Sequence, residues 1–107
     1  MTDKILTLLG FAAKAGKLSY GAAKATASIY GRRAALIVTA CDLSDKSKKE
    51  MCYHAAKKQI PIEIFTTYDS QTLSNAVGRR CAVLSVEDES FASAIIRAMQ
   101  ESASKAQ

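Results

Sequence analysis

The sequence contains little of what several protein classes require. It has no tryptophan, one proline, and only four tyrosines and three phenylalanines among 107 residues, which argues against a surface that stacks many nucleic-acid bases side by side. No apolar run approaches the ~20 residues that cross a membrane, and the first residues lack the basic and apolar pattern of a signal peptide. We therefore expect a cytoplasmic protein with no membrane partner.

Cysteine and histidine are also scarce. Cys41, Cys52 and Cys81 are odd in number and widely spaced, so they form neither a disulfide framework nor a zinc motif. The single histidine, His54, lies two positions from Cys52, and residues two apart in a helix face different directions. The acidic run 87–89 is more typical of caps for a following helix than of a metal site. The sequence thus predicts a protein that is not an enzyme and has no cofactor.

The segment GFAAKAGK, residues 10–17, has some features of a nucleotide-binding loop. That motif requires four residues between its first glycine and Gly-Lys, and then a serine or threonine that binds Mg²⁺. Here five residues, 11–15, intervene, and Leu18 follows Lys17. The preceding residues also have helical rather than strand spacing. We conclude that the chain has no nucleotide site of this kind.

Positive charge is concentrated in the first half of the chain. Residues 1–58 hold eleven basic and four acidic residues (+7), and residues 59–107 hold four and six (−2), which together give the net charge of +5. A basic half favours a polyanionic partner, although a merely solvated basic surface is the alternative. Many of the basic residues flank turns and glycines, where exposed backbone N–H groups can meet phosphate. Structured RNA, recognised by its shape, is the partner that this arrangement favours.

The apolar pattern is that of one α/β domain spanning residues 1–107, with a polar tail from about Glu101. In chain order we expect a helix capped by Thr2 or Asp3 that ends near Gly16, a turn, a helix at 22–30, a strand at 34–40, a helix from 43–44, a strand at 60–66, a helix at 71–77 capped by Ser70, a strand at 81–86 and a helix containing 92–99. Strands separated by helices predict a three-layer α/β/α sandwich with a small mixed central sheet.

Three segments carry a resemblance to a known family. They are GKLSYGAAKATASIYGRRAALIVTACDLS (16–44), QIPIEIF (59–65) and LSNAVG (73–78). Together they resemble the ribosomal-protein L7Ae/L30e family, in particular its small bacterial members, and the similarity runs from about Ile5 to Ile96. The resemblance implies the α/β/α sandwich independently of the apolar pattern. It also implies binding to kink-turns, which are sharp bends in RNA, in the ribosome or in another ribonucleoprotein.

The resemblance also implies which residues contact RNA. Family members use the N-terminus of the second helix, the loop after the first main strand and the loop before the last strand, which correspond here to 21–24, Asp42 and 79–81. Basic residues near these turns complete the predicted site. Its members are Lys17, Gly21, Ala22, Ala23, Lys24, Asp42, Lys46, Arg79, Arg80 and Cys81.

The sequence departs from the family pattern at the second helix. The strongest RNA binders carry Gly-x-Asn-Glu-x-x-Lys, whereas Gly21 is followed here by Ala23, Lys24 and Ala27 at the last three motif positions. Ser74 also replaces a glycine found in many members. We expect phosphate contacts to persist and base-specific reading to be weakened. The alternative is a protein-interaction module on the same fold that has lost RNA reading. No uncommitted apolar stripe is evident, so we expect a monomer.

Overall fold

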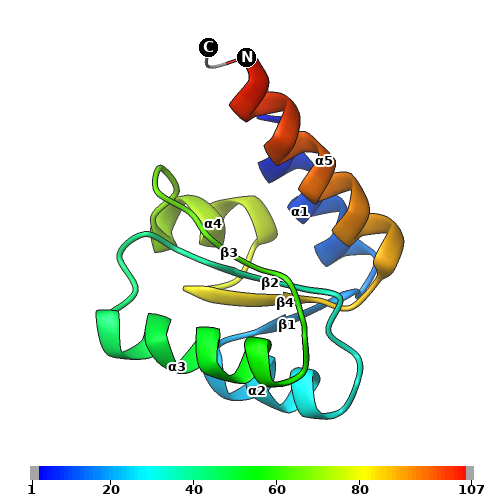
Figure 1. Ribbon diagram of the computed structural model, residues 1–107. Coiled ribbons are helices and arrows are strands. Elements are labelled where there is room, and N and C mark those ends of the chain that lie inside the picture. Colours follow the sequence, from blue (N-terminus) through cyan, green and yellow to red (C-terminus); the bar gives the residue numbers. More distant parts are fainter. Residues whose placement is uncertain (1–2, 106–107) are drawn as a thin grey trace.

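The computed structural model describes the backbone of residues 3–105 and the side chains of residues 3–101. Helices and strands alternate along the chain (Figure 1). Their bounds are α1 (Lys4–Lys14), β1 (Leu18–Tyr20), α2 (Ala22–Tyr30), β2 (Leu36–Thr39), α3 (Asp45–Lys57), β3 (Ile62–Ile64), α4 (Ser70–Val77), β4 (Val83–Val86) and α5 (Glu89–Lys105).

Short polar side chains begin the helices, as their sequence positions predict. Asp3 caps α1 by accepting hydrogen bonds from the N–H groups of the first turn, whereas Thr2 lies outside the described residues. Gly21 and Gly31 flank α2 as expected. The prediction for α4 was wrong by one residue, because Asp69, not Ser70, is its cap. The Asp69 carboxylate accepts from the N–H of Thr72 at 2.8 Å, and a carboxylate is favoured at the positive end of a helix.

The sheet is mixed, as predicted, and has the strand order β1-β4-β2-β3. Strand β4 runs antiparallel to both β1 and β2, and β2 runs parallel to β3. The sequence did not reveal β1, which occupies the expected turn between α1 and α2. Three residues between two glycine-containing turns carry too little pattern to indicate a strand, and it is their pairing with β4 that makes them one. The C-terminal ends of β1 and β2 therefore lie beside the N-terminal end of β4.

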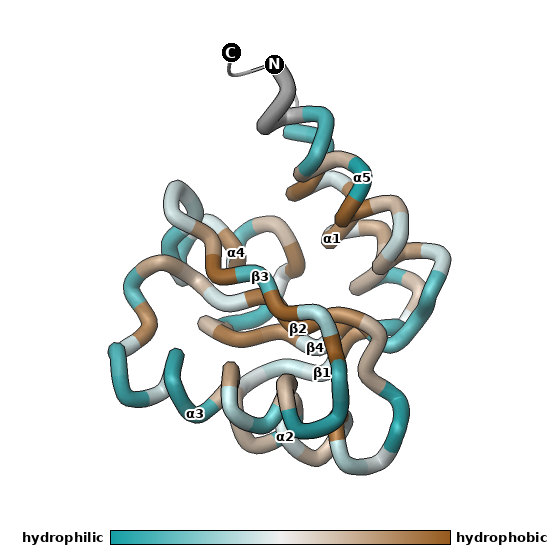
Figure 2. Tube along the Cα trace, viewed as in Figure 1, coloured by the Kyte–Doolittle hydropathy of each residue, from teal (hydrophilic) through white to brown (hydrophobic). Residues whose placement is uncertain are grey.

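Helices cover both faces of the sheet, which confirms the α/β/α sandwich (Figure 1). Helices α1, α4 and α5 pack on one face, and α2 and α3 pack on the other. The alternation along β4 fits this arrangement, because Leu84 and Val86 belong to the first core and Val83 to the second. Figure 2 shows the central strands as the most hydrophobic part of the trace, and α3 as largely hydrophilic.

The last helix is longer than the apolar pattern indicates. Helix α5 continues through Glu101 to Lys105, so the backbone of the expected polar tail is helical as far as the structure describes it. Across the described residues, no helix combines the length and the apolar character needed to cross a bilayer.

Candidate nucleic-acid interface

Three segments that are distant in sequence meet at one end of the sheet. They follow β1, follow β2 and precede β4, and backbone hydrogen bonds join them. The N–H of Gly21 donates to the carbonyl of Val83 at 2.8 Å, and the N–H of Ala40 donates to that of Ala82 at the same distance. The strand register therefore fixes the relative positions of the α2 N-terminus and the loop before β4.

The N-terminus of α2 presents open backbone donors. Gly21 has φ 91° and ψ 159°, a conformation that glycine adopts at low cost and other residues rarely do. No side chain of the described residues caps this helix, and Ala22, Ala23 and Lys24 are exposed. Their N–H groups and the helix dipole together give a positive end that can accept an anion.

The loop before β4 places Arg79 next to this helix end. The guanidinium of Arg79 lies 4.6 Å from the centroid of the Tyr20 ring, and Tyr20 directly precedes Gly21. Burial raises the pKa of Tyr20 above its ordinary 10.0, against the effect of the neighbouring Arg79, so the ring is neutral and attracts the cation. A cleft of about 740 Å³ beside the loop is lined by Arg79 and Arg80, together with residues of α4.

Ser74 holds this loop in place. Its hydroxyl accepts a hydrogen bond from the N–H of Cys81 at 3.0 Å and donates to the carbonyl of the same residue at 3.2 Å. A glycine at this position could make neither bond. Cys81 is only 7% exposed, and burial raises the pKa of its thiol, against the effect of the Ser74 hydrogen bond. Cys81 is therefore a nearly buried residue of the loop, and both of its backbone polar groups are bonded to Ser74.

Asp42, in the loop after β2, lies at the same end of the sheet as Gly21, but its carboxylate already has partners. It accepts hydrogen bonds from the backbone N–H and the hydroxyl of Ser70, at 2.9 and 2.8 Å. Asp42 thus joins the loop after β2 to the first residue of α4. Lys48 steadies the same loop by donating to the carbonyl of Cys41 at 2.8 Å. The exposed Lys46, in the first turn of α3, completes this group of residues.

Lys17 is separated from the other predicted residues. It precedes β1, and its carbonyl accepts from the N–H of Glu87, which follows β4. Because β1 and β4 are antiparallel, Lys17 lies at the opposite end of the sheet from Gly21. It lines a separate cavity with Arg32, Arg33 and Glu87.

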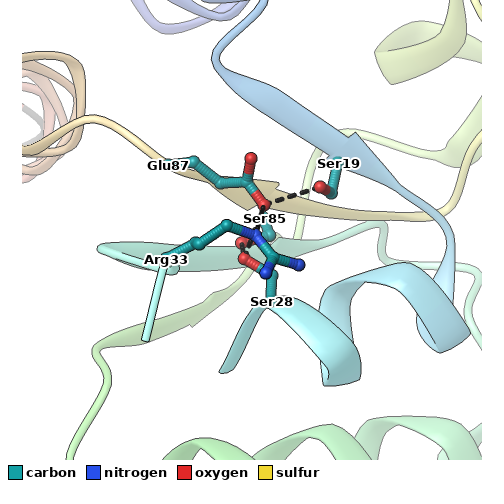
Figure 3. Close-up of polar contacts among 5 residues, drawn as sticks. All are labelled: Ser19, Ser28, Arg33, Ser85 and Glu87. Carbon is teal, nitrogen blue, oxygen red and sulfur yellow. Dashed lines mark hydrogen bonds and ion pairs between the residues drawn. The ribbon is translucent and has the colours of Figure 1, made fainter. Parts of the chain in front are cut away.

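That opposite end contains a polar network that sequence reasoning missed (Figure 3). One carboxylate oxygen of Glu87 accepts hydrogen bonds from the hydroxyls of Ser19 and Ser28, each at 2.6 Å. Ser28 also pairs with Ser85 at 2.8 Å, and Arg33 Nε lies 3.6 Å from the same carboxylate oxygen. Burial alone would raise the pKa of Glu87, but these hydrogen bonds and the guanidinium hold it below its ordinary value. The signal available in the sequence was Ser85, a polar residue within an apolar strand.

The fold agrees with the comparisons with known proteins. The chain belongs to the ribosomal protein L7Ae/L30e/S12e/Gadd45 family, whose profile matches residues 3–96. The family resemblance predicted from the sequence is therefore confirmed.

Individual relatives extend this assignment. The chain is similar to the RNA-binding protein YlxQ of Enterococcus faecium, with 27% identity over 90 residues that cover 84% of this chain and 85% of YlxQ. It also resembles a protein of unknown function from Bacillus halodurans, with 25% identity and a TM-score of 0.88; the match covers 92% of this chain and 99% of that protein. The 15.5kD RNA binding protein of Giardia lamblia shares the fold, with a TM-score of 0.72 at 17% identity; the match covers 92% of this chain and 83% of that protein.

Proposed function

We propose that this chain is a non-catalytic RNA-binding protein that recognises structured RNA of the kink-turn type as part of the ribosome or another ribonucleoprotein. The observation that carries the proposal is the shared position of the open α2 N-terminus and the Arg79–Arg80 loop at one end of the sheet. Membership of the family and the similarity to a protein named as RNA-binding support it.

The proposed contacts are mainly to the RNA backbone. The open N–H groups of α2 bind a phosphate, and Lys24, Lys46, Arg79 and Arg80 supply positive charge around it. None of these four forms an ion pair with an acidic side chain within the described chain, so their charge is available to a polyanion. With alanine and lysine at positions 23 and 24, the helix end offers neither the amide nor the carboxylate that could read a base edge. Recognition would therefore depend on the shape of the RNA.

The test is a titration of the protein against a kink-turn RNA and a straight duplex of equal length, at about 50 mM and about 200 mM salt. A preference for the kink that persists at the higher salt is expected. Equal binding to both RNAs, lost together as salt rises, would contradict the proposal. A protein complex that forms without RNA and is insensitive to salt would favour the protein-interaction module instead.

Two substitutions test the site itself. Arg79→Ala is expected to weaken kink-turn binding, and Lys24→Glu to reduce the salt dependence by at least about one unit of slope, because a phosphate contact is lost. Arg97→Ala is the matched control, because it removes an exposed positive charge from α5, away from the proposed site. Unchanged affinity in both site variants would exclude these residues from the RNA contact.

A further inference from the structure

Two exposed tyrosines pack against His54 on the α2–α3 layer. Tyr30 ends α2 and is 40% exposed, and Tyr53 in α3 is 60% exposed. The rings of both lie against His54, with centroids 5.4 and 5.3 Å from it and interplanar angles of 78° and 70°. Few aromatic residues occur in the sequence, yet the packing of α2 against α3 gathers three of the rings at one place. We call Tyr30, Tyr53 and His54 the ring cluster.

The ring cluster is held in a fixed geometry. The Tyr30 hydroxyl and His54 Nδ1 are 2.7 Å apart, a hydrogen bond that joins the two helices. A lysine ammonium lies over each ring: Lys57 Nζ is 5.5 Å from the centroid of Tyr53, and Lys58 Nζ is 5.7 Å from that of Tyr30. Rings ordered in this way lose little freedom when a flat ligand stacks on them.

The charge around the ring cluster indicates the kind of ligand. Lys46, Lys49, Tyr53 and Lys57 occur at intervals of three and four residues and are all exposed, so they form one row along α3. The row begins at Lys46, at the end of the sheet proposed above for RNA. The row holds one exposed ring with lysines on both sides, which suits a strand that places a base on the ring and its phosphates beside the lysines. An apolar protein partner would not need these charges.

We propose that the ring cluster is a stacking site for unpaired bases of single-stranded RNA, with the lysines of the α3 row on its phosphates. The proposal rests on the proposed function in one respect: the single strand would be an extension of the structured RNA that begins beside Lys46. The stacking itself requires no kink and can be measured separately. One or two bases suffice for this surface, which is smaller than a platform for a long single strand.

The test is fluorescence anisotropy with a labelled ten-nucleotide single-stranded RNA, for the wild type and for Tyr53→Ala, Tyr53→Phe and Arg79→Ala. Tyr53→Ala is expected to weaken binding about tenfold, as the loss of one stacked base does. Tyr53→Phe keeps the ring and should bind like the wild type. Because neither change at Tyr53 alters the charge, binding by charge alone would not distinguish the two variants. Arg79→Ala should bind the single strand normally.

A kink-turn RNA with blunt stems separates this site from the one proposed above. The affinity for this RNA should fall in Arg79→Ala and stay unchanged in Tyr53→Ala. Wild-type binding of the single strand by Tyr53→Ala, or no binding by the unmodified protein, would overturn the stacking site whatever the kink-turn titration gives. Because Tyr53 is largely exposed and alanine favours helix, the variant should remain folded, which circular dichroism checks.

Discussion

Removing the Glu87 carboxylate should destabilise the protein in a pH-dependent way. In Glu87→Ala the hydroxyls of Ser19 and Ser28 lose a shared charged acceptor. A hydrogen bond to a charged group contributes about 1.5–3 kcal/mol. Ser28 keeps its bond to Ser85, and the partly exposed Ser19 can bond to water, so neither is left unsatisfied. Arg33 is more than half exposed and adds little. Because both hydroxyls keep or find another partner, we expect the two lost bonds together to cost about 2–3 kcal/mol at pH 7. The total free energy of unfolding of a protein is typically about 5–15 kcal/mol.

The sign of the pH dependence follows from the pKa of Glu87. Its pKa in the folded protein lies below the ordinary 4.5, so the charged form stabilises the fold. That stabilisation is complete at pH values above the pKa of Glu87 in the unfolded chain. It is lost as the pH falls through the pKa of Glu87 in the folded protein. The difference in stability between the wild type and Glu87→Ala should therefore be constant from pH 7 to about pH 5.5 and narrow below pH 4.5.

Urea unfolding at several pH values measures this difference directly. Glu50→Ala is the control, because it removes an exposed carboxylate from α3 and should change stability by less than about 0.5 kcal/mol. A difference at pH 7 below about 0.5 kcal/mol, or one that stays the same down to pH 3, would refute the assignment of Glu87 as a charged acceptor in the fold.

Three further substitutions test local features. Ser74→Ala should cost about 1–2 kcal/mol and speed hydrogen exchange of the Cys81 amide, which loses its acceptor; unchanged exchange would contradict this. Asp42→Ala should cost about 1 kcal/mol, measured by urea unfolding, because the α4 start loses its acceptor. Gly21→Ala should cost about 1–3 kcal/mol and lower the melting temperature, because alanine rarely adopts a φ of 91°. An added Cβ would meet no atom within 4 Å, so the loss would come from backbone strain and not from a steric clash.

The helices and the strands β2, β3 and β4 were predictable because their signals are local. Apolar spacing, glycines at helix ends and the apolar runs before Cys41 and Glu87 set most of the boundaries. Strand β1 was not predictable in this way, since Leu18–Tyr20 becomes a strand only through backbone bonds to β4, more than sixty residues later. The cap of α4 was ambiguous because Asp69 and Ser70 are adjacent residues that both favour helix starts.

The candidate site shows a similar division. The family resemblance implied that residues 21–24, Asp42 and residues 79–81 share one site, and the structure brings these segments to the same end of the sheet. Lys17 was grouped with them as a basic residue beside the glycine turn at Gly16, but the three residues of β1 separate it from Gly21 and place the two at opposite ends of the sheet. The partner of Asp42 is 28 residues away, and the contact between Tyr30 and His54 joins two helices. No local pattern encodes such pairs.

The two ends of the sheet satisfy their polar groups in different ways. At the Lys17 end, the carboxylate of Glu87 binds serines from β1 and α2 and faces an arginine from the following loop, so the polar groups find partners within the chain. At the Gly21 end, the donors of α2 and the charges of Lys24 and Arg80 face solvent. A fold held together at one end can leave donors open at the other, because its stability does not depend on satisfying them. Glu87→Ala should therefore lower stability without altering the selectivity for kink-turn RNA at temperatures where the variant is folded. Arg79→Ala should instead reduce the selectivity for kink-turn RNA and leave the stability of the fold unchanged.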